Sequence, residues 1–297
     1  MSQYICVDIG GTSIKHGVLD ENAIIKECNQ TKTEAWLGGA AVLDKVKTIG
    51  KQYKEQYENI EGICISTAGM VDPEVGKIVF AGELMPGYTG TCIKKELEKA
   101  LEMPCEVEND VNCAGLAEYV SGSAKESHIM FCATVGTGIG GCAIVNGRIF
   151  HGASNSACEV GYIPMGDSDF QTLGASSILV RKVAEKKIEP LDMWDGKKIF
   201  ALAEKGDKVC ISAIKEMCDV LGKGLATICY VLNPDTIVLG GGIMVQKKIL
   251  ENEIRDSLNR YLRPILAEHL QVCFAEYGNE AGMVGALYNF QNKYGRK

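Results

Sequence analysis

The 297-residue sequence lacks the features that mark nucleic-acid-binding, membrane or metal-binding proteins. It has no run rich in Lys and Arg, and 31 basic against 38 acidic residues give a net charge of -7, so we expect no nucleic-acid partner. No apolar run approaches the roughly 18 residues of a membrane-spanning helix. Four histidines at no ligand-like spacing argue against a metal cluster. We therefore expect a soluble protein with no membrane partner.

Cysteine is abundant, but no C-x-x-C pair occurs and the count of 13 is odd. The N-terminus has neither the basic stretch nor the apolar stretch of a signal peptide. These features predict reduced thiols in a cytoplasmic protein. Most of the cysteines alternate with Val, Ile and Ala, as Cys6, Cys64, Cys132 and Cys142 do, and free Cys commonly behaves as a small buried hydrophobe. Core packing is their predicted role.

The hydrophobic pattern predicts alternating strands and helices, and hence an α/β fold. The predicted strands are 4–9, 13–19, 23–25, 60–66, 105–107, 129–135, 142–145 and 236–239, and the predicted helices are 40–57, 211–231, 249–262 and 282–290. A strand, a glycine-rich turn and a returning strand occur near the start of the chain and again from residue 129. This repetition indicates two similar halves.

The first glycine turn, Gly10-Gly11-Thr12, directly follows a predicted buried strand. Its backbone N–H groups can approach an anion closely, Thr12 and Lys15 add a hydroxyl and a positive charge, and Asp8 could hold Mg²⁺ through water. The P-loop sequence G-x-x-x-x-G-K-[ST] is absent. A double glycine after a strand is more often only a tight hairpin, so both interpretations stay open for this turn alone.

Two further glycine clusters follow predicted strands. Gly136-Thr137-Gly138 is followed at once by Gly140-Gly141, and ligand contact and a structural turn are equally good interpretations of this segment. Gly240-Gly241-Gly242 lies at the carboxyl end of a strand, where α/β folds tend to bind ligands, although an ordinary strand-to-helix turn would look the same.

Two polar segments could act on a substrate. Asp110 follows a short strand and could accept the proton of an attacking hydroxyl, with Asn109 orienting the substrate, but Asn and Asp are also favoured N-caps and this segment alone favours a cap. Glu159 stands among small residues and could accept hydrogen bonds from sugar hydroxyls, whereas a solvated surface glutamate is the commoner case.

The order of these motifs resembles the ROK family of sugar kinases and repressors along nearly the whole chain. The resemblance rests on Asp8-x-Gly10-Gly11-Thr12-x-x-Lys15, Asn109-Asp110, Gly136-Thr137-Gly138-x-Gly140-Gly141, Glu159-x-Gly161 and Gly240-Gly241-Gly242. It implies an α/β protein with two actin-like (ribonuclease H-like) domains and a cleft between them. We expect an N-terminal domain over 1–112, joined by a C-terminal helix over 281–297, and a larger domain over 113–280.

The resemblance also implies roles for the motifs, with ATP and Mg²⁺ as cofactors. Asp110 would be the catalytic base. Gly10, Gly11, Thr12 and Lys15 would contact the transferred phosphate, Gly136, Thr137 and Gly138 the phosphates further back, and Gly240, Gly241 and Gly242 the adenosine side. Asp8 would support Mg²⁺ indirectly, and the sugar would be held by Gly69, Asn109, Asp110, Glu159 and Tyr162.

The sequence departs from the family pattern at two positions. Many members have a histidine where this chain has Tyr162, and a cysteine-rich zinc box whose closing Glu falls near Thr172. Since there is no Cys between Cys158 and Cys210, we expect no zinc site. The chain resembles the zinc-free branch of the family, which includes β-glucoside kinases. Its loop Pro86-Gly87-Tyr88-Thr89-Gly90 is similar to the corresponding loop in that branch.

We therefore expect a homodimeric kinase that phosphorylates glucose or a β-glucoside, usually at the C6 hydroxyl. An N-acetylmannosamine kinase or a fructokinase of the same family is the alternative. A sugar-sensing repressor would carry a helix-turn-helix ahead of the first strand, but that strand is entered by Tyr4. The presence of Asp8, Lys15 and Asp110 argues against a third interpretation, a sugar-binding module that has lost catalysis.

Overall fold

The computed structural model describes residues 2–295, which divide into two compact units. Unit 1 comprises residues 2–122, 149–157 and 279–295, and unit 2 comprises residues 123–148 and 158–278. The domain boundary proposed after residue 112 falls inside the helix Asp110–Ser121, which packs on the C-terminal helix and so belongs to unit 1.

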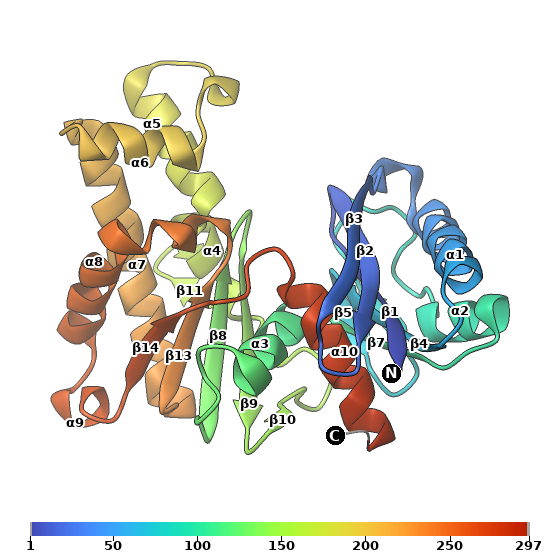
Figure 1. Cartoon of the computed structure of the whole chain (residues 1–297). Helices are drawn as coiled ribbons and strands as arrows, with labels where there is room; N and C mark the ends of the chain where they lie inside the picture. The colour runs from blue at the N-terminus through green and yellow to red at the C-terminus, as the bar shows by residue number, and fades with distance from the viewer. Residues whose placement is uncertain (1, 296–297) are drawn as a thin grey trace. The chain divides into compact units, whose positions relative to one another are not determined.

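Unit 1 is built on a five-stranded sheet of order β3-β2-β1-β4-β7 (Figure 1). Its strands are β1 Gln3–Ile9, β2 Ser13–Asp20, β3 Ile25–Lys32, β4 Ile60–Thr67 and β7 Cys105–Asn109, with a small second sheet of β5 Met70–Asp72 and β6 Lys77–Phe80. Its helices are η1 Ala35–Leu37, α1 Gly39–Gln56, α2 Ile93–Leu101, α3 Asp110–Ser121 and α10 Ala281–Tyr294. Strands β1, β4 and β7 run parallel, and β1-β2-β3 is an antiparallel meander.

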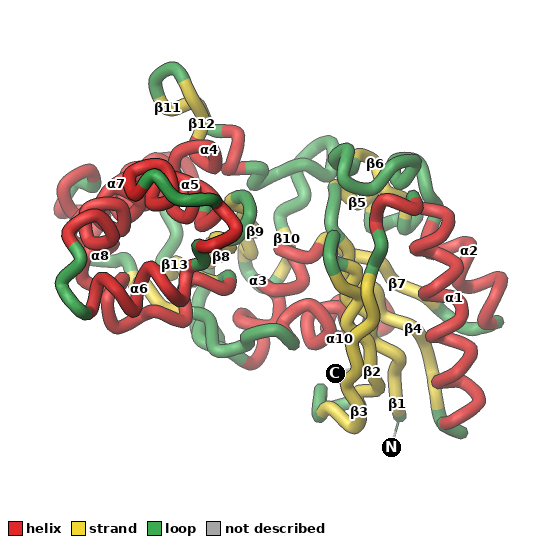
Figure 2. The backbone as a smooth tube through the Cα atoms, turned by 90° about the horizontal axis from the view of Figure 1, so that it is seen from above, coloured by secondary structure: helices red, strands yellow, loops and turns green. Residues whose placement is uncertain are grey.

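Alternation along β1 divides the side chains of unit 1 between two helical layers. Ile5, Val7 and Ile9 join the core under α1 and α2, while Tyr4 packs its ring on Phe290 of α10, 5.4 Å between centroids. Figure 2 shows α1 and α2 on one side of the strands and α10 on the other. Asp8 therefore points toward α10, at the carboxyl end of β1.

Unit 2 repeats the same sheet order with different helices (Figure 1). Its sheet is β10-β9-β8-β13-β14, made of β8 Ile129–Val135, β9 Ile139–Val145, β10 Arg148–Ile149, β13 Thr236–Gly240 and β14 Gln271–Phe274, and a hairpin joins β11 Pro164–Met165 to β12 Ser168–Asp169. The helices are η2 Val160–Tyr162, α4 Phe170–Gly174, α5 Ser176–Lys187, η3 Leu191–Met193, α6 Gly196–Glu204, α7 Lys208–Leu232, η4 Gly242–Gln246, α8 Lys247–Tyr261 and α9 Pro264–Ala267.

The α/β fold with two similar halves is thus confirmed. The predicted end of the C-terminal helix also needs correction. The helix expected over 281–297 runs from Ala281 to Tyr294 and ends there because Gly295 adopts a left-handed conformation at φ 63°; positions 296 and 297 lie outside the described residues.

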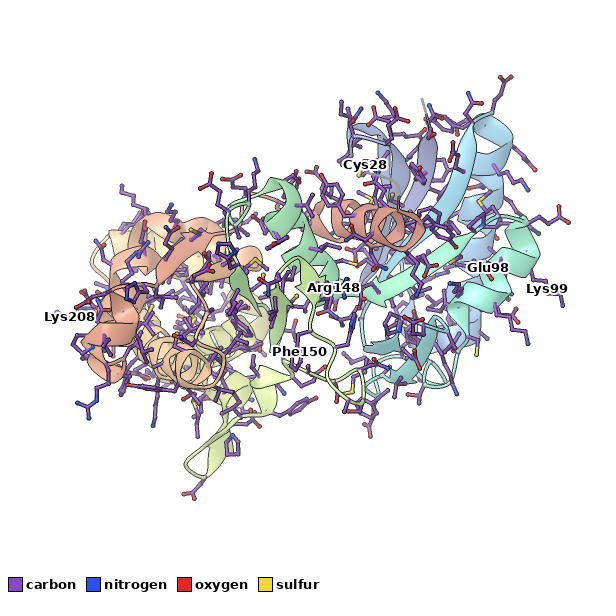
Figure 3. All side chains as sticks on the ribbon, turned by 90° about the horizontal axis from the view of Figure 1, so that it is seen from below. Cys28, Glu98, Lys99, Arg148, Phe150 and Lys208 are labelled. Carbon is purple, nitrogen blue, oxygen red and sulfur yellow. The ribbon has the colours of Figure 1, made fainter. Side chains whose placement is uncertain are left out.

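The cysteines also occupy the expected positions. All thirteen are free thiols, and Cys6, Cys64, Cys132 and Cys142 are buried. Cys28 is exposed on the edge strand β3, where Figure 3 labels it. Within residues 2–295, every helix is too short or too polar to cross a membrane.

Candidate active site

The strand register of unit 1 places four polar side chains in one row across the sheet. Lys15 of β2 is opposite Asp8 of β1, Asp8 is opposite Ser66 of β4, and Ser66 is opposite Glu108 of β7. The next row along the two parallel strands β4 and β7 pairs Thr67 with Asn109. We refer to Lys15, Asp8, Ser66 and Glu108 as the polar row. It lies at the carboxyl ends of the parallel strands, where α/β folds bind ligands.

Asp8 is held by neighbours on three sides. Its Oδ1 accepts a hydrogen bond from Ser66 Oγ at 2.7 Å, and Lys15 Nζ lies 3.7 Å from its Oδ2. A Cβ on Gly282, in the first turn of α10, would lie 2.5 Å from the carboxyl carbon, so only glycine fits there. Burial raises the pKa of Asp8, and the Ser66 hydrogen bond and the Lys15 charge oppose that shift.

Asn109 is the N-cap of α3. Its Oδ1 accepts from the backbone N–H groups of Val111 and Asn112 at 2.9 and 3.0 Å, and its Nδ2 donates to Gly69 O at 2.9 Å and to Asp110 Oδ1 at 3.0 Å. The four hydrogen bonds use the whole carboxamide. The capping interpretation therefore applies to Asn109, and Asp110 occupies the first helical position.

Asp110 is partly buried and has one carboxylate oxygen unengaged. Oδ1 accepts from Asn109 Nδ2 and from Val111 N, whereas Oδ2 has no hydrogen-bond partner among residues 2–295. Burial, and secondarily the negative charge of Asp8, raise the pKa of Asp110 to about 7. A carboxylate with a pKa near physiological pH is suited to take up a proton there.

One further pair beside this site, Glu108 and His151, was not predicted from the sequence. Glu108 is fully buried; its Oε1 accepts from the Asn109 N–H and from Asn112 Nδ2, and its Oε2 lies 2.8 Å from His151 Nε2. The Glu108 carboxylate raises the pKa of His151. The pair fixes the segment that carries Asn109 and Asp110, and no local sequence pattern could have joined residues 43 positions apart.

The first glycine turn is a closed hairpin with an exposed tip. The Gly10 N–H donates to Ser13 O at 3.1 Å, so this donor is already used. Neither Gly10 nor Gly11 has a positive φ, and a Cβ on Gly11 would meet nothing within 4 Å. Because neither backbone strain nor packing requires glycine at position 11, the open space over Gly11 and the exposed Thr12 is the part of the turn that a ligand could use.

The segment expected to line a sugar site adjoins Asn109. Gly69, at φ 99°, offers its carbonyl to Asn109 Nδ2, and a Cβ there would lie 2.8 Å from Phe80 O. The buried Tyr88 phenol lies 2.7 Å from Thr67 Oγ1, next to Asn109 in the sheet register. Burial, and to a lesser extent the negative charge of Asp110, raise the pKa of Tyr88. The loop between β6 and α2 thus starts beside this site at Phe80 and contacts it again through Tyr88.

Unit 2 contains a cavity of about 550 Å³, a size typical of small-molecule sites. Its lining includes Gly136, Thr137 and Gly242 from the predicted cofactor residues, together with Ser176, Ser177, Val180, Asp195, Gly196, Lys197, Ile243, Val245 and Gln246, which sequence reasoning missed. Ser176 and Ser177 start α5, and their hydroxyls donate to Gly136 O at 2.6 Å and to Thr137 O at 2.7 Å.

The remaining predicted glycines of unit 2 pack against the fold. Gly241 has φ 97° and a Cβ there would lie 2.4 Å from Val135 O, while a Cβ on Gly138 would lie 2.7 Å from Gln171 Oε1. Gly240 is the last residue of β13, and a Cβ there would make only ordinary van der Waals contacts. Although Gly136, Gly138 and Gly141 have G-x-G-x-x-G spacing, they join two antiparallel strands, whereas the dinucleotide-binding fingerprint opens a helix.

Glu159 is the N-cap of the short helix η2 in unit 2, Tyr162 is the last residue of that helix, and both are exposed. The Glu159 carboxylate makes no capping hydrogen bond to η2, so it is not used to start the helix. Gly161 fits against β9, since a Cβ there would lie 2.4 Å from Ile139 O. Thr172 is exposed on α4, where its backbone N–H donates to Asp169 Oδ1 at 2.7 Å.

Comparison with known proteins identifies the fold and then the family. A glucokinase from Streptomyces griseus in complex with glucose and AMPPNP superposes with a TM-score of 0.83 at 28% identity, over 97% of this chain and 98% of that one. A ROK family protein from Streptococcus pneumoniae TIGR4 in complex with sucrose gives 0.85 at 28% identity, over 99% and 100%. The fold is therefore the two-domain actin-like fold of sugar kinases.

The family assignment rests on the whole sequence. The β-glucoside kinase of Klebsiella pneumoniae is 30% identical over 295 residues, which are 97% of this chain and 95% of the relative. The sequence model of the ROK family matches residues 4–293. The chain belongs to the ROK family, and the resemblance inferred from its motifs is confirmed.

Proposed function

We propose that this protein is an ATP-dependent sugar kinase that phosphorylates glucose or a β-glucoside at the C6 hydroxyl. Its class, a phosphotransferase with an alcohol group as acceptor, is that of its sugar-kinase relatives. The observation that carries the proposal is Asp110, a partly buried carboxylate with a pKa near 7 and one unengaged oxygen at the start of α3.

In the proposed reaction Asp110 is the general base. The C6 hydroxyl gives its proton to Asp110 Oδ2 as its oxygen bonds to the γ-phosphorus of ATP, and the bond from that phosphorus to the bridging oxygen of ADP breaks. Asn109 holds Asp110 Oδ1 and cannot itself take the proton. Since Oδ1 is engaged on the helix side, only Oδ2 remains for the substrate.

Asp8 is the residue we propose to support Mg²⁺. Among residues 2–295 no group of three or more His, Cys, Asp or Glu side chains could hold a metal. A single carboxylate fits a cation that keeps several waters and shares its remaining ligands with substrate phosphates, as Mg²⁺ commonly does. When bound, Mg²⁺ neutralises charge on the phosphates, and Lys15 beside Asp8 adds a second positive charge.

The cavity of unit 2 is our proposed site for the nucleoside end of ATP. Gly136, Thr137 and Gly242 supply backbone surface with little steric bulk, and Lys197 supplies a positive charge. The proposal agrees with AMPPNP being bound by the S. griseus glucokinase. Glu159 and Tyr162 are proposed to contact the sugar.

A substrate panel tests the proposed function. The purified protein is incubated with ATP, Mg²⁺ and glucose, N-acetylmannosamine, fructose or cellobiose, and ADP formation and product masses are measured. We expect glucose and the β-glucoside to give 6-phosphates at the highest kcat/KM. A strong preference for N-acetylmannosamine or fructose would overturn the substrate, and no sugar-dependent ADP formation would overturn the kinase.

A further inference from the structure

Unit 1 exposes three large apolar side chains on two segments that meet. Trp36 and Leu37 of η1 are 72% and 56% exposed, and Leu84, in the loop between β6 and α2, is 79% exposed. The backbone N–H of Gly39 donates to Pro86 O at 2.9 Å, and Ala35 and Met85 pack in the same core. We call Trp36, Leu37 and Leu84 the apolar rim. An exposed tryptophan is unusual, because Trp is highly buried on average.

The η1 helix is fixed in place. Lys45 Nζ donates to the carbonyls of Lys32 and Thr33 at 3.1 and 2.9 Å and pairs with Glu34, and Leu37 N donates to Glu34 O at 2.9 Å. Gly39 lies so close to the loop that a Cβ there would be 2.7 Å from Tyr88 Cα. Trp36 is therefore held outward on an ordered turn.

Both segments of the rim lead directly to the proposed site. Thr33, three residues before Trp36, donates from its hydroxyl to Gly10 O at 2.6 Å and from its N–H to Thr12 O at 3.0 Å. The loop carrying Leu84 begins after Phe80, whose carbonyl faces Gly69, and it also carries Tyr88, whose phenol contacts Thr67 beside Asn109. Figure 2 shows β6 passing into this long loop.

We propose that the apolar rim binds the aglycone, or the second sugar ring, of a β-glucoside whose phosphorylated glucose ring occupies the Asn109–Asp110 site. The inference rests on the proposed function and names the substrate class within it. The faces of sugar rings and aryl aglycones carry C–H and aromatic surface that packs on an indole ring. Free glucose carries no such group, so under this proposal it leaves the rim uncovered.

The kinetic test compares cellobiose with glucose in the Trp36→Ala variant. We expect kcat/KM for cellobiose to fall at least about tenfold, the range for loss of one apolar contact, and kcat/KM for glucose to stay within about twofold. Ile24→Ala, which truncates another exposed apolar side chain of unit 1, should change neither value. Equal losses for both sugars, or no loss for either, would overturn the proposal.

A binding test does not depend on turnover. The chain has two tryptophans, and Trp194 is buried with its Nε1 lacking a hydrogen-bond partner among the described residues, so Trp194→Phe removes no hydrogen bond and leaves Trp36 as the sole indole. Cellobiose should lower acrylamide quenching of Trp36 at least about twofold, and glucose should not. If cellobiose leaves the quenching of Trp36 unchanged, the rim is not a glucoside site. The same conclusion follows if protection of Trp36 depends on protein concentration, because a second copy of the chain would then cover it.

The two tests separate failure of the rim from failure of the kinase. If no sugar supports ADP formation but cellobiose still protects Trp36, the kinase proposal fails and the rim stands. If glucose is phosphorylated and Trp36→Ala leaves the cellobiose-to-glucose ratio of kcat/KM unchanged, the rim fails and the kinase stands.

Discussion

Units 1 and 2 share one sheet order and one hairpin but differ in what stands beside the hairpin. In unit 1, Asp8 precedes the turn by two residues and faces Lys15 across the strands. At the equivalent places of unit 2, Thr134 precedes the turn and faces Gly140. The same backbone thus presents charged groups in one unit and small neutral ones in the other. We infer that unit 1 handles the charge and the proton, and that unit 2 mainly binds.

The largest expected effect concerns Asp110, the proposed base of unit 1. Asp110→Asn keeps the acceptor for Val111 N but cannot take up a proton, so we expect kcat with the preferred sugar to fall about 1000-fold. The sugar KM should change little. Asp44→Asn, at an exposed carboxylate of α1, is the control and should keep normal activity. Near-normal turnover in Asp110→Asn would remove the base assignment.

The same variant should be more stable than the native protein at alkaline pH. Because the folded pKa of Asp110 is raised to about 7, its ionisation weakens folding as pH rises above the unfolded value near 4. Removing the charge should raise the free energy of unfolding at pH 8 by roughly 1 to 3 kcal/mol and leave it unchanged at pH 4. Denaturant unfolding at the two pH values measures this, and a loss of stability at pH 8 would contradict it.

The two glycine turns give the next comparison. Gly11→Ala and Gly136→Ala both add a methyl group into open space at negative φ, so the free energy of unfolding should change by less than about 1 kcal/mol. If both turns approach phosphates, kcat/KM for ATP should fall about tenfold or more in each. Gly241→Ala is the contrast, since its positive φ and the 2.4 Å approach to Val135 O should destabilise unit 2. Normal ATP kinetics in Gly11→Ala would show that the first turn is only a structural hairpin and does not approach the phosphates.

The smallest expected effect concerns the Glu108–His151 pair. The pKa of His151 is higher in the folded protein than in the unfolded chain, where it is near 6.5. Protonated His151 therefore contributes its full stabilisation at pH values below 6.5, and this stabilisation is lost as pH rises through the folded pKa. His151→Ala should lower the free energy of unfolding by about 1 kcal/mol at pH 6 and by less at pH 9. His269→Ala, at an exposed histidine, is the control. A loss that does not depend on pH would show that the ion pair contributes nothing.

Much of the fold could be predicted because alternating apolar residues mark its strands. The strand predicted over 129–135 matches β8, and after the returning strand Asn146-Gly147 forms a tight turn with both residues at positive φ. The pairing of Asp8 with Ser66 and of Ser66 with Glu108 could not be predicted, because register between distant strands depends on tertiary packing.

Some residues of the candidate site could likewise be predicted from the sequence, and others could not. Asp8, Asn109 and Asp110 were predicted from the order of motifs that resembles the ROK family, whereas His151 is brought to Glu108 by a segment that returns to unit 1 from later in the chain. Ser176, Ser177 and Lys197 were missed because a serine pair and a surface lysine are common in any sequence. The glycine at 241 is explained by its positive φ and its close approach to the Val135 backbone, whereas a Cβ on Gly138 would meet only the flexible end of the Gln171 side chain.

The most direct test of the account is the pH dependence of kcat/KM for glucose in the native protein. If Asp110 is the base, kcat/KM should rise about tenfold per pH unit below an inflection near pH 7 and level off above it. Asp8→Asn, although less active, should move that inflection to lower pH, because the Asp8 charge contributes to raising the pKa of Asp110. A flat profile between pH 5 and 8 would contradict the central claim that Asp110 takes the proton.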